Sequence, residues 1–153
     1  MKIALIVLFV FIGLFLTFLV VSANNSKTGQ ALGLIDGSLA PCGDKPNCLC
    51  SAYKDDSDHF LSPIELPQNL DIDLQVIKNS IEEIGGVIHS ENGGYIVASF
   101  SSALFGFVDD FEVQVDLVNH VLQVRSASRV GYSDGGANKK RIELFRKTLS
   151  KNF

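Results

Sequence analysis

The sequence predicts an α+β fold, an antiparallel sheet of about four strands with two flanking helices. Segments 71–84 and 137–149 have apolar residues at helical spacing, and the segments between them alternate apolar and polar residues as strands do. A long apolar run and an irregular, disulfide-stapled arm are expected to precede these elements. We therefore expect a signal anchor or signal peptide at 1–23, a linker at 24–35 and one globular domain at 36–153.

The N-terminal segment is apolar enough to cross a membrane or to direct export. Residues 3–21 contain no charged side chain, and only Gly13 and Thr17 interrupt the apolar run. As a helix this run covers about 28 Å, close to the hydrocarbon thickness of a bilayer. Val21-Ser22-Ala23 has the small residues that a signal peptidase requires, so cleavage and secretion is the alternative. We expect an uncleaved single-pass anchor in the cell membrane, with Lys2 in the cytoplasm and the domain in the periplasm or another extracytoplasmic space.

Three cysteines lie close together in the arm. An oxidising compartment permits a disulfide, and the pairing Cys42–Cys48 is the first choice and Cys42–Cys50 the second. A bridge between Cys48 and Cys50 would be strained, because both side chains point the same way in an extended chain. A zinc site formed by the cysteines and His59 matches no common ligand spacing, so we expect neither a metal nor a cofactor.

The first helix is predicted over 71–84, where Asp71 or Asp73 can cap its start and Gly85-Gly86 can end it. Its apolar residues share one stripe: Leu74, Ile77, Ile81 and Ile84. The last helix is predicted over 137–149, with Ser133 or Asp134 as its cap. Its apolar residues are Ile142, Leu144, Phe145 and Leu149.

Two hairpins are predicted between these helices. Strands 87–90 and 95–102 flank Glu91-Asn92-Gly93-Gly94, a strong turn signal. Strands 111–117 and 121–128 are expected to pair through a tight turn at Asn119-His120. The expected register has these cross-strand pairs: Leu117 with Leu122, Val115 with Val124, Gln114 with Arg125, and Asp110 with Arg129.

The charges form two blocks of opposite sign. The formal net charge is −4, yet residues 36–116 hold 15 acidic side chains and three lysines, while residues 125–153 hold eight basic and two acidic side chains. We expect the blocks to neutralise each other across the fold; the alternative is a basic C-terminal helix that meets anionic lipid or an acidic partner. An acidic chain without basic residues interleaved with aromatic ones predicts no nucleic-acid partner.

Two motifs bear on catalysis. Gly131-Tyr132-Ser133-Asp134-Gly135 has the G-x-S-x-G form, but no histidine follows it, so we interpret it as a turn and helix cap. The densest charged cluster combines the segment 109–112 with Arg125, Arg129 and Arg141. Its arginines and carboxylates either satisfy each other structurally, or they line a cleft in which an arginine holds an anionic group and a carboxylate acts as acid or base.

Three sequence blocks resemble the domain-of-unknown-function 1499 family over about residues 33–150. They are the stretch from Cys42 to Cys48, the stretch from Phe107 to Glu112, and Arg125-Ser-Ala-Ser-Arg129-Val-Gly131-Tyr-Ser-Asp134 with Asn138 and Arg141. Cys50 stands where that family usually has serine, and this departure favours the Cys42–Cys48 bridge. The resemblance implies no reaction. It does imply a candidate site formed by Asp109, Asp110, Glu112, Arg125, Arg129, Ser133, Asp134, Asn138 and Arg141.

The function expected from these observations is non-catalytic binding in the cell envelope. The polar Asp/Arg cluster would hold an unknown envelope ligand or protein partner, while residues 3–21 hold the chain to the membrane. The alternative is a small hydrolase that uses the carboxylates of Asp109, Asp110 and Glu112 beside Arg125 and Arg129.

Overall fold

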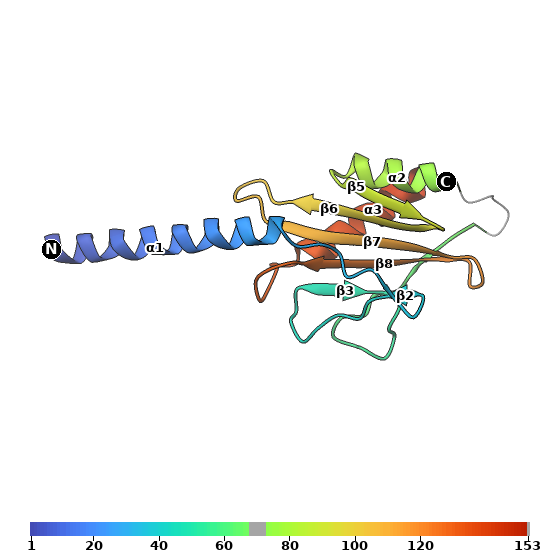
Figure 1. Ribbon diagram of the computed structural model, residues 1–153, viewed down its shortest axis with the longest axis horizontal. Helices are drawn as coiled ribbons and strands as arrows, with labels where there is room; N and C mark the ends of the chain where they lie inside the picture. The colour runs from blue at the N-terminus through green and yellow to red at the C-terminus, as the bar shows by residue number, and fades with distance from the viewer. Residues whose placement is uncertain (68–72, 153) are drawn as a thin grey trace.

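The computed structural model describes residues 1–67 and 73–152 (Figure 1). An isolated helix leads into an α+β domain, as the sequence predicts. The elements are α1 (Lys2–Lys27), β1 (Leu34–Ile35), β2 (Ser38–Leu39), β3 (Cys48–Cys50), β4 (Ile64–Glu65), α2 (Leu74–Glu83), β5 (Val87–Asn92), β6 (Tyr95–Ser101), β7 (Val108–Asp116), β8 (Val121–Ser128) and α3 (Ala137–Asn152).

The main sheet is antiparallel and larger than the four strands expected. Its six strands follow the order β3-β8-β7-β6-β5, with β4 also paired to β8. The two additional strands come from the arm, where Cys48 pairs with Ala127 and Ile64 pairs with Leu122. Each of these strands has only two or three residues, too few for an alternating pattern to reveal it.

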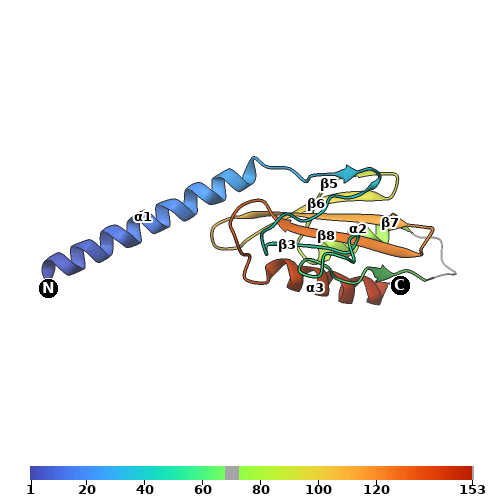
Figure 2. The same cartoon turned by 90° about the horizontal axis from the view of Figure 1, so that it is seen from below.

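Helices α2 and α3 cover one face of the sheet, which confirms that prediction (Figures 1 and 2). The core lies between them and the strands. At its centre, the ring of Phe111 meets that of Phe145 edge-on at 5.2 Å and that of Phe100 at 5.5 Å. Burial of these rings and of the Ile77 and Ile81 stripe holds the helices to the sheet.

An aspartate caps the start of each of the two helices that cover the sheet, α2 and α3. Asp73 caps α2, since its carboxylate accepts a hydrogen bond from the Gln75 amide at 2.8 Å; the other predicted cap, Asp71, lies outside the described residues. The Asp134 carboxylate accepts from the amides of Gly136 and Asn138 at the start of α3. The prediction that Ser133 or Asp134 caps the last helix is therefore confirmed for Asp134.

Both hairpins form, but the β7–β8 register differs from the expected one by two residues. Glu112 is opposite Arg125, and Val115 is opposite Leu122. The connection has four residues, 117–120, because the Asp116 carboxylate accepts from the amides of Val118 and Asn119. A shift of two keeps every side chain on its expected face, so alternation alone could not separate the two registers.

The arm is the stretch between α1 and α2, and its first part, residues 29–40, packs on the sheet face that the helices leave open (Figure 2). The Gly33 amide donates to the Glu112 carboxylate at 3.1 Å, and the Gln114 side chain donates to the Gly37 carbonyl at 2.7 Å. Leu39 and Ala40, at the end of this part of the arm, are fully buried. The segment expected to be irregular is therefore a structural layer of the domain.

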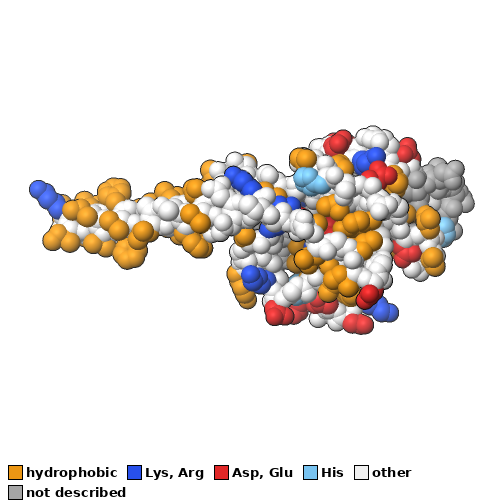
Figure 3. Space-filling model, in the orientation of Figure 1, with side chains coloured by type: hydrophobic (Ala, Val, Ile, Leu, Met, Phe, Trp, Pro, Cys, Tyr) orange, Lys and Arg blue, Asp and Glu red, His pale blue; other side chains and the backbone are white. Residues whose placement is uncertain are grey.

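Most of helix α1 is exposed, but its last two turns contact the domain. It is long and apolar enough to cross a membrane, and apolar side chains cover it along its length (Figure 3). Its last turns are different: Ala23 and Ser26 are each 1% exposed, and the Ser26 hydroxyl accepts from the Val108 amide at 2.9 Å. The helix continues through Lys27, into the segment predicted as a linker.

Candidate functional site

Seven of the nine residues of the candidate site divide between the two faces of the sheet, and Ser133 and Asp134 lie in the loop between β8 and α3. Successive residues of a strand point to opposite faces, so Asp109 lies on the helix-covered face and its neighbour Asp110 on the arm-covered face. Arg141 and Asn138 join Asp109, while Arg125, Arg129 and Glu112 lie with Asp110. The structure therefore places Asp109, Asn138 and Arg141 in one group and Asp110, Glu112, Arg125 and Arg129 in another.

On the helix-covered face, Arg141 holds α3 to the sheet. Its guanidinium donates to the Asp109 carboxylate at 2.7 Å and to the Ser126 hydroxyl at 2.8 Å, and it stacks over the Phe100 ring at 4.7 Å. Asn138 is buried and donates to the Asn47 carbonyl at 2.8 Å. These contacts join α3 to three strands (β6, β7 and β8) and to the arm.

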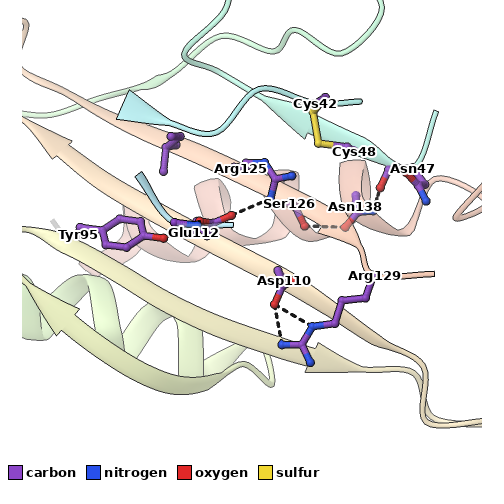
Figure 4. Close-up of polar contacts among 12 residues, drawn as sticks. Cys42, Asn47, Cys48, Tyr95, Asp110, Glu112, Arg125, Ser126, Arg129 and Asn138 are labelled. Atoms are coloured by element: carbon purple, nitrogen blue, oxygen red, sulfur yellow. Dashed lines mark hydrogen bonds and ion pairs between the residues drawn. A yellow bond between two sulfur atoms is a disulfide. The ribbon is translucent and has the colours of Figure 1, made fainter. Parts of the chain in front are cut away.

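On the arm-covered face, Glu112 and Arg125 form a buried ion pair at 2.7 Å (Figure 4). Glu112 is fully buried and also accepts from the Tyr95 hydroxyl at 2.5 Å and from the Gly33 amide. Burial raises the pKa of Tyr95 above its usual value, and the hydrogen bond to Glu112 raises it further. The Nε of Arg125 is buried without a hydrogen-bond partner among the described residues.

Arg129 connects the sheet to the apolar helix. Its guanidinium donates to the Asp110 carboxylate at 2.7 and 3.0 Å, and a third nitrogen–hydrogen group donates to the Ser26 carbonyl at 3.1 Å. Ser26 lies in the last turn of α1, where unpaired carbonyls carry partial negative charge, so a guanidinium is favourable there. A β-carbon at Gly29 would lie 2.9 Å from the Arg129 side chain, so any larger residue here would have to displace that side chain.

The three carboxylates proposed for hydrolysis are each held by an arginine: Asp109 by Arg141, Asp110 by Arg129, and Glu112 by Arg125. A general acid or base must reach its substrate with a free oxygen, and a fully buried, fully hydrogen-bonded Glu112 does not. Ser133 is exposed in the β8–α3 loop and accepts only a 3.4 Å hydrogen bond from the Gly135 amide. This geometry is that of a structural network, the first of the two interpretations above.

Cys42 and Cys48 form the disulfide, and Cys50 is free and buried. Burial raises the pKa of the Cys50 thiol above its usual value. His59 bonds to the Asp56 carboxylate at 2.9 Å and to the Lys45 carbonyl at 3.2 Å. Both its ring nitrogens are thus engaged away from the cysteines, and no group of metal-ligating side chains converges anywhere in the described part of the chain.

A groove of about 510 Å³ opens on the arm-covered face, between the start of the arm and strands β5 and β6. Its polar lining includes Lys27, His89, Tyr95, Ser99 and Arg129. Of these only Arg129 belonged to the expected site. Tyr95 could have been found by alternation, since it shares a face with Glu112, whereas Lys27 and His89 reach the groove through the docking of α1 and a bulge between Ile88 and Ser90.

Comparison with known proteins places the chain in a family. No curated protein matches the chain, and no solved structure does. The model of the family described as "Protein of unknown function (DUF1499)" matches residues 38–149, most of the domain, including the disulfide, the β7–β8 hairpin and nearly all of α3. The chain therefore belongs to the DUF1499 family.

Proposed function

We propose that this protein is a membrane-anchored, extracytoplasmic binding module that holds a small ligand in the groove between the arm and strands β5 and β6. The groove carries the proposal, because it is a concave surface of about 510 Å³ lined by several convergent polar groups. The Asp/Arg cluster first expected to bind the ligand acts instead as its support, since its carboxylates and arginines satisfy one another.

The ligand carries an anionic group. Lys27 and Arg129 both line the groove, and Asp110 neutralises Arg129 but not Lys27. Lys27 forms no ion pair with any residue of 1–67 or 73–152, and its Nζ donates to the neutral Asn24 side chain at 3.1 Å. His89, held to the Ser99 hydroxyl at 2.7 Å, adds an imidazole on the opposite wall. A phosphate or carboxylate between these walls would meet donors from both sides.

An uncleaved anchor fits this arrangement best. Ala23, the last residue of the signal-peptidase motif, is buried against the domain, and Lys27 reaches the groove from the last turn of the same helix. The disulfide supports an oxidising compartment for the domain. The apolar helix thus both holds the chain to the membrane and completes the binding surface.

Native mass spectrometry of the full chain, extracted from membranes of an exporting host in mild detergent, tests this proposal. We expect a reproducible adduct on the wild type that is lost in Lys27→Gln and in His89→Ala. The matched control is Lys147→Gln, which removes an exposed lysine on α3 and should keep the adduct. A wild-type mass equal to the bare chain less two hydrogens, or an adduct that survives both groove variants, would contradict the proposal.

A further inference from the structure

The end of the domain nearest α1 carries two loops with exposed apolar side chains. The β6–β7 loop spans 102–107 and the β8–α3 loop spans 129–136. Residues 102–107 carry no charge, and neither do residues 130–133, which lie between Arg129 and Asp134. Leu104 is 82% exposed and Tyr132 is 71% exposed. Both loops extend from the same end of the sheet as α1 (Figures 1 and 2).

These loops lie beside the part of α1 that belongs to the apolar run. A hollow of about 400 Å³ separates the helix from the loops. Phe18 and Leu19 of α1 line its membrane-facing side, and its inner wall is polar, with the side chains of Asp109 and Asp134. Phe18 lies about 13 Å along the helix from Lys27, toward the membrane-spanning part. If α1 spans a bilayer through residues 3–21, this hollow lies at the depth of the outer leaflet.

The height of the domain above the membrane is fixed, so this placement does not depend on a flexible linker. Arg129 donates to the Ser26 carbonyl, and the Val108 amide donates to the Ser26 hydroxyl. Ala23 is buried against the domain one turn earlier. A bilayer that accepts Phe18 and Leu19 must therefore also meet the loops beside them.

We propose that the 102–107 and 130–133 loops insert into the outer leaflet around the anchor. This inference rests on the membrane anchoring proposed above. Exposed single apolar residues are common on protein surfaces, but these are continuous with the apolar surface of a spanning helix. Uncharged loops with apolar side chains beside a membrane anchor are typical of contacts with the membrane–water interface. Tyrosine is enriched at this interface, and Tyr132 would place its ring there with the hydroxyl toward water.

The chain contains no tryptophan, so a single introduced tryptophan reports its own surroundings. Full-length Leu104→Trp and Tyr132→Trp would be reconstituted into phosphatidylcholine vesicles containing phosphatidylglycerol, with or without lipids brominated near the headgroup end of their acyl chains. The matched control is Val118→Trp, because Val118 is 90% exposed in the β7–β8 turn, at the other end of the sheet. Phe9→Trp, in the middle of α1, reports whether the anchor itself is inserted.

We expect brominated lipid to quench Leu104→Trp, Tyr132→Trp and Phe9→Trp, with a blue-shifted emission, and to leave Val118→Trp unchanged. Quenching of Phe9→Trp alone would overturn the loop insertion while keeping the anchor. Quenching of none of the four would overturn both the anchor and the loop insertion. Equal quenching of Val118→Trp would show that the whole domain adheres to lipid, which would also overturn a contact confined to these loops.

Discussion

The charge of Glu112 should be essential to the stability of the domain, and Glu112→Gln tests this with little change in shape. The substitution keeps an oxygen that can accept from Tyr95 or Gly33 but removes the negative charge beside Arg125. Arg125 is 5% exposed, so its charge would remain in the protein interior without a counter-ion. Breaking a buried ion pair on one side costs about 3–5 kcal/mol, and the retained oxygen places the expected loss near 3 kcal/mol.

Glu91→Gln is the matched control. Glu91 pairs with Lys78 at 2.6 Å, but the side chains are 32% and 25% exposed, so water replaces the lost partner. Surface pairs of this kind contribute about 0–1 kcal/mol. The double variant Glu112→Gln with Arg125→Met removes both buried charges, and we expect it to recover most of the stability lost in Glu112→Gln.

Pulse proteolysis of the full chain in detergent micelles across a urea series measures the unfolding of the domain without a signal from α1. The free energy of unfolding falls by roughly 1.5 kcal/mol per molar urea for a domain of this size. A loss of about 3 kcal/mol in that free energy therefore lowers the urea midpoint of unfolding by about 2 M. The reasoning is refuted if Glu112→Gln and Glu91→Gln shift the midpoint equally. It is also refuted if the double variant is as unstable as Glu112→Gln, since the cost would then not come from an unpaired Arg125.

Two further predictions concern titrating groups near this pair. The pKa of Tyr95 is raised in the folded chain, so hydroxide deprotonates the unfolded chain first, and stability should fall as the pH rises above about 10. Urea midpoints at neutral and alkaline pH should show a smaller fall for Tyr95→Phe, and an unchanged fall would contradict the role of Tyr95. The buried Cys50 thiol should resist iodoacetamide in the folded chain and become the one alkylated cysteine after unfolding without reductant. Peptide mapping checks this, and alkylation of Cys48 instead would indicate the Cys42–Cys50 pairing.

Helices and strands with a long periodic pattern could be predicted from the sequence. Short strands that form only through pairing with distant segments could not. The apolar run, the stripe of Ile77 and Ile81 and the alternation in β7 each repeat often enough to specify an element. Strands β3 and β4 are defined by their pairing with β8 rather than by any pattern of their own. The order of the sheet and the packing of the arm depend on such distant contacts.

The sequence predicted that the charges of the Asp/Arg cluster would pair, but not how the pairs are arranged, and it pointed to only one residue of the groove, Arg129. The acidic and basic blocks do neutralise each other at Glu112–Arg125, Asp110–Arg129 and Asp109–Arg141. The assignment of Gln114 opposite Arg125 was wrong, because the side chain of Asp116 lengthens the turn in a way that a search for two-residue turns does not anticipate. Strand alternation alone would have separated Asp109 from Asp110, and applying it would have divided the cluster between the two faces.

The contact between Arg129 and the last turn of α1 fixes how the domain is rotated about the axis of that helix. Because the guanidinium is also fixed by Asp110, a rotation of α1 about its axis must turn the sheet by the same angle. If α1 is a membrane anchor, as we propose, a partner that touches only this helix inside the membrane would therefore set the direction in which the groove faces. Helix–helix contacts between two such anchors would likewise present their grooves at a defined mutual orientation.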